Sequence, residues 1–293
     1  MSGISQVKWT VTTEKMPWKS NVNPMLKKYN ATKQHLVEIF PSGKLQQIDG
    51  FGGCFNERGM DALSVLPENK KQEVLKQLFD SISGCAFNIC RMPIGANDYS
   101  MDYYSLNDTP EDYDMKNFSI ERDQKYLIPY IRMAMNYNAK LKIWGSPWTP
   151  PSWMKVSNHY ACQGVEATSH LRWEPKILKA YALYFEKYVK AYRKEGIDIY
   201  AIHVQNEPYA CQNFPSCLWT GAQMRDFVRD YLGPKLAGLH TEIWLGTINN
   251  GRYDDCAGVV LSDPEAAKYI TGVGYQWDGK HAIATTAAKH PGV

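Results

Sequence analysis

Two adjacent polar residues, Asn206 and Glu207, follow an apolar run that begins at Ile199. The run is rich in β-branched residues, which is typical of a buried strand in a parallel sheet. Pro208 has no N–H, so the strand must end before it. Catalytic groups of eight-stranded βα barrels lie at such strand ends. The pair therefore indicates a candidate proton donor next to an amide, whereas the alternative is that Glu207 only begins a polar loop.

Two charged residues follow an earlier predicted strand. Arg91 lies near the end of residues 86–93 and Asp98 lies in the loop after it. We expect Arg91 to pair with an active-site carboxylate and Asp98 to accept hydrogen bonds from sugar hydroxyls. The alternative is a capped loop with a surface aspartate.

A loop stiffened by prolines carries three tryptophans, Trp144, Trp148 and Trp153. Indole faces suit the C–H faces of a pyranose ring, and the indole N–H can donate to a hydroxyl. We expect at least one of the three to bind sugar and one to pack against its own barrel. Further aromatic residues, among them Trp277, lie in predicted loops and are candidates for the same role.

Other chemistries lack their motifs. The sequence has no HExxH, no GxSxG and no GxxxxGK[ST], and its seven histidines are scattered, so neither a metal nor a cofactor is expected. His203, alone on an apolar strand, is expected to be a hydrogen-bonded core residue. A net charge of +3 without a basic block does not favour a nucleic-acid or membrane partner.

The seven cysteines form no CxxC pair, and their odd number argues against a complete disulfide framework. We expect seven thiols, with a Cys211–Cys217 bridge as the alternative. Residues 1–10 have no apolar core of a signal peptide, which favours the cytoplasm, or secretion if the N-terminus is incomplete.

Residues 1–48 are predicted to be short β segments, including 7–13 and 36–40, flanking a larger α/β body over 49–293. Six strands are predicted there: 47–55, 86–93, 141–146, 200–205, 242–248 and 272–277. Six helices are predicted between them. The first begins at Pro67, the second at Ser119 and the third spans 174–195. The fourth contains residues 224–231 and breaks at Gly233-Pro234, the fifth begins at Asp263, and the sixth spans about 282–289.

Strands that alternate with helices predict parallel βαβ units. A doubly wound nucleotide fold is disfavoured because Asp49–Phe55 does not match GxGxxG. Long loops after the strands favour a (β/α)8 barrel, of which six of eight strands would be present. We therefore expect a chain truncated at its C-terminus, poorly stable and inactive by itself.

Five motifs in chain order resemble glycoside hydrolase family 30, the glucosylceramidase-like retaining β-glycosidases. They are residues 49–53, Arg91-Met92-Pro93 with Asp98, residues 146–154, residues 204–208 and residues 263–269. The resemblance runs from about residue 36 to the last residue. It implies a (β/α)8 barrel with a β-sandwich side domain, to which residues 1–48 would contribute.

The resemblance also implies roles at the matching positions. Glu207 would be the acid/base, Asn206 would contact the sugar 2-hydroxyl, and Asp98 and Trp148 would line the subsite of the non-reducing sugar. Trp277 would be a further wall. The nucleophile would be a glutamate ending a seventh strand beyond Val293, so no residue here takes that role.

The substrate class follows from the same resemblance. Residues 274–279 depart from the His-bearing version of the animal lysosomal enzymes and are closer to bacterial members. β-Glucosides and 1,6-linked β-glucans are the expected substrates, with β-xylosides and xylan behind. The alternatives are a non-catalytic carbohydrate-binding protein, an inactive fragment, and, least favoured, a metal-dependent enzyme. The sequence does not define an oligomeric state.

Overall fold

The computed structural model describes residues 8–22 and 40–293. The chain divides into two compact units, Met1–Ile48 and Asp49–Val293. In the first unit, β1 (Lys8–Thr13) pairs antiparallel with β2 (Met16–Val22), so the strand predicted at 7–13 is confirmed. The strand predicted at 36–40 falls mostly outside the described residues.

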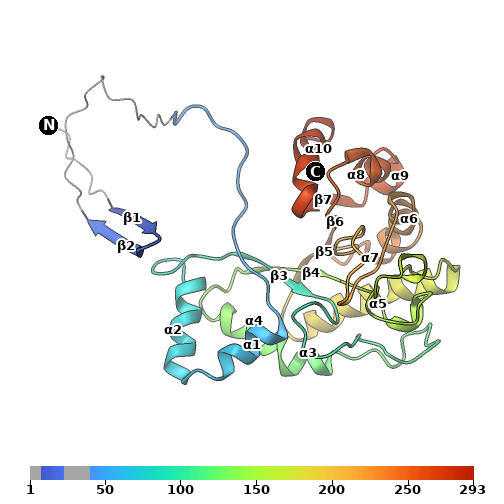
Figure 1. Ribbon diagram of the computed structural model, residues 1–293, viewed down its shortest axis with the longest axis horizontal. Helices are drawn as coiled ribbons and strands as arrows, with labels where there is room; N and C mark the ends of the chain where they lie inside the picture. Colours follow the sequence, from blue (N-terminus) through green and yellow to red (C-terminus); the bar gives the residue numbers. More distant parts are fainter. Residues whose placement is uncertain (1–7, 23–39) are drawn as a thin grey trace. The chain divides into compact units, whose positions relative to one another are not determined.

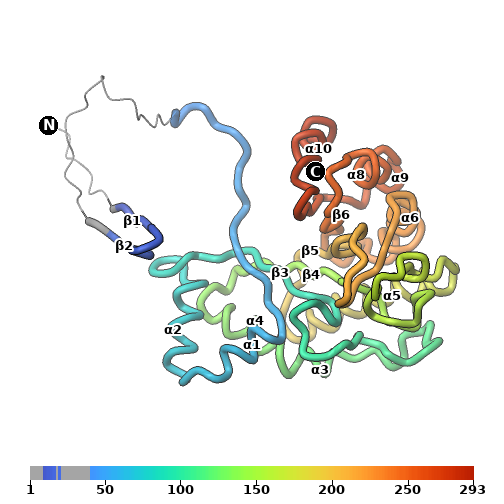
Figure 2. Tube along the Cα trace, in the orientation of Figure 1, coloured from blue at the N-terminus to red at the C-terminus, as the bar shows by residue number. Residues whose placement is uncertain are grey.

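The second unit contains a five-stranded parallel sheet in the order β3-β4-β5-β6-β7. The strands are β3 (Ile89–Pro93), β4 (Lys142–Ser146), β5 (Ile199–His203), β6 (Glu242–Ile248) and β7 (Ile270–Tyr275). Each strand pairs with the next one in the chain, so the colours of β3, β4, β5 and β6 in Figure 2 follow the order of the sequence. Their carboxyl ends therefore share one edge of the sheet.

The predicted strand at 47–55 is wrong, because it is reduced to a single bridge between Cys54 and Arg91. This segment still runs alongside β3, and Asn88 and Arg91 donate backbone hydrogen bonds to Phe51 and Gly53. A Cβ on Gly52 would lie inside the Ile89 carbonyl group, so the close approach requires glycine there. Five of the six predicted strands thus occur.

Helices connect the strands and flank the sheet (Figure 1). They are α1 (Glu57–Ser64), α2 (Glu68–Phe79), α3 (Glu121–Lys125), α4 (Leu127–Met135), α5 (Pro175–Lys194), α6 (Gly221–Phe227), α7 (Gly233–Leu236), α8 (Ala257–Leu261), α9 (Pro264–Ala267) and α10 (Ile283–Lys289). Short 3-10 turns occupy Ser152–Met154, Glu166–Thr168, Tyr253–Asp255 and Trp277–Ala282. The prediction for α5 is accurate to one residue at each end, whereas α1 and α8 were not predicted.

The expected break at Gly233-Pro234 is wrong. After α6 the chain makes a π-helical turn over Val228–Leu232 and continues directly into α7. Pro234 lies in the first turn of α7, directly after the residues whose helical turn is of the wider π type. Gly233 packs against the ring of Tyr269, where a Cβ would clash.

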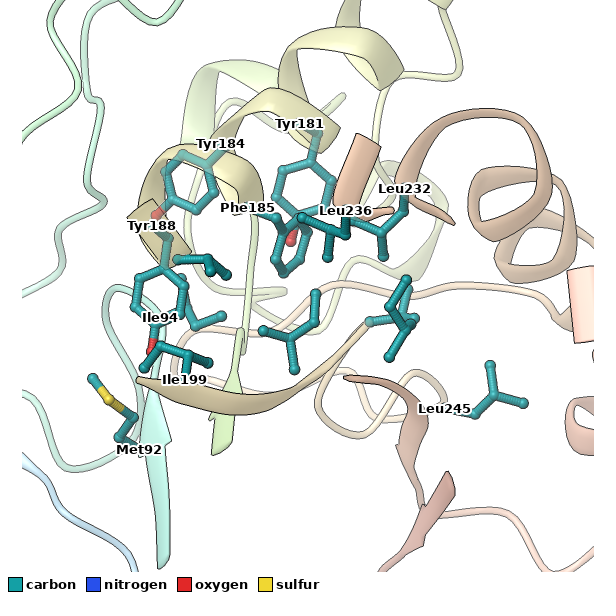
Figure 3. Packing of buried hydrophobic residues seen from close by; sticks show 14 of the residues in the cluster. Met92, Ile94, Tyr181, Tyr184, Phe185, Tyr188, Ile199, Leu232, Leu236 and Leu245 are labelled. Carbon is teal, nitrogen blue, oxygen red and sulfur yellow. The ribbon is translucent and has the colours of Figure 1, made fainter. Parts of the chain in front are cut away.

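The core lies between α5 and the sheet (Figure 3). Four tyrosines of α5, at positions 181, 184, 188 and 192, are fully buried. Their spacing of three and four residues places them along one helix face. Tyr188 approaches Ile94 and Ile199, which anchors the helix over β3 and β5. These tyrosines thereby hold α5 against one face of the sheet.

Asp123 of α3 is fully buried beside this core. Its carboxylate accepts hydrogen bonds from Tyr192 Oη at 2.7 Å and Tyr104 Oη at 3.1 Å. Burial raises the pKa of Asp123 to about 6, although both hydroxyls oppose the shift. The contact links α5 to the loop after β3, which carries Asp98. In the part of the chain that the structure describes, no helix combines the length and apolarity that crossing a membrane requires.

Candidate active site

Asn206 and Glu207 lie three and four residues beyond the end of β5, on the carboxyl edge of the sheet. The Asn206 N–H donates to the Pro147 carbonyl at 2.7 Å, and the Glu207 N–H donates to the Thr247 carbonyl at 2.9 Å. The loop after β5 is thus fixed by the ends of β4 and β6. Glu207 has a φ of 44°, a backbone conformation that is strained for a residue with a side chain. Residues with such strained backbones are concentrated at functional sites.

Arg91 reaches Asn206 across the sheet edge. Its Nη2 lies 2.6 Å from Asn206 Oδ1 and 2.8 Å from Ser146 Oγ. The guanidinium also stacks on Trp148, with 4.2 Å between Cζ and the ring centroid. Burial lowers the pKa of Arg91 to about 10, while its electrostatic interactions with the ionisable groups of Cys54, Glu207 and Asp98 oppose the shift. Arg91 therefore stays protonated near neutral pH.

Thr247 completes the surroundings of the Asn206 amide. Its Oγ1 donates to Asn206 Oδ1 at 2.8 Å. Both donors approach the oxygen of the amide, so the oxygen is fully occupied. Asn206 Nδ2 makes no hydrogen bond to another described residue. The amide is therefore oriented to offer N–H groups, not its oxygen, to a ligand.

Trp277 joins the site from the turn after β7. Its indole N–H donates a hydrogen bond to Glu207 Oε1. The indole is 74% exposed, so one of its faces is open to a ligand. Glu207 itself is half-buried, although the strand that precedes it is buried.

Of the other predicted residues, Trp148 and Asp98 lie close to Arg91, whereas Trp153 does not. Trp148 is buried under Arg91 and supports it. Asp98 is exposed at the loop after β3; desolvation raises the pKa of its carboxyl, and the positive charge of Arg91 opposes this. Trp153 does not join them, because it is buried with its N–H bonded to the Asn107 carbonyl at 3.0 Å. It is the tryptophan of this loop that packs against its own barrel.

A cavity of about 730 Å³ lies against the inner face of the sheet, below these loops. Its lining includes Arg91, Trp144, His203 and Trp244. The Trp144 and His203 rings are in contact, with centroids 4.4 Å apart. His203 is buried, but neither ring nitrogen has a hydrogen-bond partner in residues 8–22 and 40–293, so the expectation of a bonded histidine is wrong. Burial lowers its pKa, which keeps the ring neutral.

The loops after β4 and β5 are joined by a disulfide between Cys162 and Cys211, with Cα atoms 5.1 Å apart. The expectation of seven thiols and the alternative Cys211–Cys217 bridge are both wrong. The reason is spatial: 49 residues separate the partners, but adjacent parallel strands bring their loops together. The Nζ of buried Lys155 donates to the Tyr160 and Ser216 carbonyls at 2.9 and 2.6 Å and connects the same loops.

Sequence reasoning missed the roles of Ser146 and Thr247, the hydroxyl residues at or near the ends of β4 and β6. Their only sequence signal is this position at a predicted strand end. No group of three or more His, Cys, Asp or Glu side chains suited to a metal ion occurs in the described residues.

A parallel sheet with helices between its strands and with polar side chains gathered at its carboxyl edge is the arrangement of the βα barrels of the α/β class. Residues 48–293 match the glycosyl hydrolase family 30 TIM-barrel domain, and the chain belongs to this family. The predicted fold class and family are confirmed.

The curated relatives of this chain include proteins named glucosylceramidase and proteins named endo-1,6-beta-D-glucanase. The chain is 34% identical to the "Putative glucosylceramidase 1" of Caenorhabditis elegans over 87% of this chain and 50% of that protein. It is 34% identical to the "Lysosomal acid glucosylceramidase" of Mus musculus over 83% and 48%. It is 29% identical to the "Endo-1,6-beta-D-glucanase" of Neurospora crassa over 90% and 55%. The chain thus spans about half the length of these curated relatives.

Solved structures agree on the fold. SrfJ from Salmonella typhimurium superposes with a TM-score of 0.84 at 27% identity, over 98% of this chain and 64% of that one. The endo-β1,6-glucanase BT3312 gives a TM-score of 0.77 at 28% identity, over 86% and 57%. Both comparisons involve little more than half of the solved chain.

Proposed function

We propose that the protein is a retaining β-glycosidase that hydrolyses β-glucosides or 1,6-linked β-glucans, with Glu207 as its acid/base. The observation that carries the proposal is the pairing of Glu207 with an oriented Asn206 amide at the end of β5. The names of its relatives support both substrate groups. β-Xylosides rank behind, because the family 30 xylanases Xyn30A from Clostridium acetobutylicum and xylanase C from Talaromyces cellulolyticus are only 23% and 24% identical to this chain.

In this mechanism Glu207 donates its proton to the glycosidic oxygen as the bond to the anomeric carbon breaks. A second carboxylate, about 5–5.5 Å away, attacks that carbon and forms a glycosyl ester. Glu207, now ionised, then removes a proton from the water that hydrolyses the ester. We assign no nucleophile among residues 49–293.

The remaining residues hold the sugar. Asn206 would donate from Nδ2 to the sugar 2-oxygen, a bond that strengthens as charge develops at the ring. Arg91 and Thr247 would hold the amide, while Asp98 would accept from hydroxyls. Trp277 would pack on the sugar and orient Glu207, and Trp148 would act through Arg91.

The test is Glu207→Gln in the protein, assayed on aryl β-glucosides with good and poor leaving groups. Poor leaving groups should lose roughly 100-fold or more in rate, because they need the proton. For substrates with good leaving groups, which form the glycosyl ester without the acid, azide should speed turnover and yield the β-glycosyl azide, because it attacks the ester without a general base. Glu242→Gln, at the start of β6, is the matched control and should behave as the parent.

Unchanged turnover of poor leaving groups in Glu207→Gln would contradict the acid/base role. Sugar binding by the parent without any turnover would favour the alternative of a non-catalytic carbohydrate-binding protein.

A further inference from the structure

A partly exposed group of aromatic side chains lies where three loops meet. We call Tyr103, His159 and Tyr160 the aromatic platform. The Tyr103 ring centroid lies 5.9 Å from that of Tyr160 and 6.2 Å from that of His159. Tyr103 is 46% exposed although it is in contact with two other rings. The platform thus presents aromatic surface to solvent, and neither Glu207 nor Trp277 belongs to it.

The aromatic platform is connected to the loop of the proposed acid/base. Tyr103 comes from the loop after β3, and its Oη donates to the Asn213 carbonyl at 2.9 Å. Asn213 follows Glu207 by six residues, and six residues span at most about 20 Å. A short oligosaccharide bound at Glu207 can therefore extend to the platform.

The backbone beneath the aromatic platform is firmly held. The Tyr160 carbonyl accepts from the buried Lys155 Nζ and from the Ser216 N–H. Ala161 forms a β-bridge with Pro215, next to the Cys162–Cys211 disulfide. A surface that is already ordered loses little conformational freedom when a ligand binds. The exposed Tyr103 ring on this ordered backbone therefore has the character of a binding surface.

We propose that the aromatic platform is a second carbohydrate-binding site, which holds a β-linked gluco-oligosaccharide outside the sugar that is cleaved. The proposal rests on the proposed function for the position of the cleaved sugar. Tyr103 would pack against the C–H face of a pyranose ring. Asp102 precedes Tyr103 in the chain, and Asn213 accepts the hydrogen bond of the Tyr103 hydroxyl through its carbonyl. Both side chains are exposed and offer polar groups to sugar hydroxyls. A glucoside with a lipid aglycone would have no second sugar to place there.

The experiment compares Tyr103→Ala with its parent in a Glu207→Gln background, where turnover is suppressed. Calorimetric titration with 1,6-linked β-glucotetraose should show binding weakened roughly fivefold to tenfold by Tyr103→Ala. Binding of methyl β-glucoside, which reaches only the cleavage subsite, should be unchanged. Equal affinities of parent and Tyr103→Ala for the tetrasaccharide would overturn the proposal.

Two further variants separate stacking from loop support. Tyr103→Phe keeps the ring but loses the bond to the Asn213 carbonyl, and it should bind the tetrasaccharide nearly as the parent does. A loss as large as that of Tyr103→Ala would assign Tyr103 to loop positioning and contradict the platform. Tyr137→Ala, at the opposite end of the sheet before β4, also loses one hydroxyl bond and should have no effect.

The two proposals can fail separately. Turnover kinetics of Glu207→Gln decide the acid/base role, whereas the tetrasaccharide titration needs no turnover. If Tyr103→Ala weakens methyl β-glucoside as much as the tetrasaccharide, the ring belongs to the cleavage subsite and the second site is excluded.

Discussion

Arg91 Nη2 lies 2.6 Å from Asn206 Oδ1, although 115 positions separate the two residues in the chain. The contact joins the end of β3 to the loop after β5 over the intervening strand β4. Because Arg91 stays charged and the amide oxygen is its acceptor, the bond is of the strong, charge-assisted kind. The orientation of Asn206 therefore depends on Arg91.

Arg91→Lys tests this dependence. Lysine keeps the charge but lacks the planar fork that reaches Asn206 and Ser146 while stacking on Trp148. We expect kcat/KM for aryl β-glucosides to fall roughly 10- to 100-fold. Arg132→Lys, at the exposed Arg132–Glu195 pair, is the control. A variant as active as the parent would show that Asn206 needs no help from Arg91.

Thr247→Val removes one hydroxyl and keeps the side-chain shape. Asn206 Oδ1 would lose its 2.8 Å donor, and the amide could then rotate. We expect about a fivefold loss in kcat. Thr271→Val removes an exposed hydroxyl that donates to Glu242 and should leave kcat unchanged. Equal kcat values for the two variants would contradict the role of Thr247.

These contacts mark the limit of what the sequence reveals. The strand before Glu207 and helix α5 were predictable, because their signals are local: an apolar run in one case and a 3.6-residue periodicity in the other. Arg91 and Asn206 were identified separately, Arg91 from its place near the end of a strand and Asn206 from its place after one. Thr247 was not identified, because a threonine in a strand is ordinary and only the pairing of β5 with β6 brings it to Asn206.

The errors also have physical reasons. The segment at 47–55 has the composition of a strand, but its glycines permit a backbone approach to β3 that is too close for a regular ladder. Trp153 could not be distinguished from Trp148 by sequence, since both lie in one proline-rich loop. Only the fold shows that the first indole bonds to Asn107 and the second lies under Arg91.

The disulfide gives a stability prediction. Closing a loop of 49 residues corresponds to about 4 kcal/mol in the chain-entropy description. Replacing both Cys162 and Cys211 by serine should lower the unfolding free energy by about that amount, measured by urea denaturation. Cys85→Ser, at an exposed free thiol, should change it little. An unchanged urea midpoint in the double variant would exclude the bond in solution.

Asp123 gives a pH-dependent prediction. Its pKa is about 6 in the folded protein and near 4 in the unfolded chain, so the folded state binds its proton more tightly. The contribution of Asp123 to stability therefore falls as pH rises from 4 to 6. Asp123→Asn cannot ionise, so its unfolding free energy relative to the parent should increase by about 2 kcal/mol between pH 4 and pH 7.

Urea denaturation of parent and Asp123→Asn at both pH values checks this. Asp198→Asn, at an exposed carboxylate paired with Arg193, is the control and should show a small difference at either pH. A pH-independent difference between Asp123→Asn and its parent would show that the carboxyl is not perturbed.

Lys155 and the Cys162–Cys211 bond connect the loops after β4 and β5, so these two loops behave as one structural unit. If the loop after β4 were replaced by one without Lys155 and Cys162, Ser216 would lose its ammonium donor and Cys211 its disulfide partner. A graft that carries residues 147–172 together with 204–220 preserves every one of these contacts. Directed recombination at this edge of the sheet should accordingly place its crossover points outside both loops.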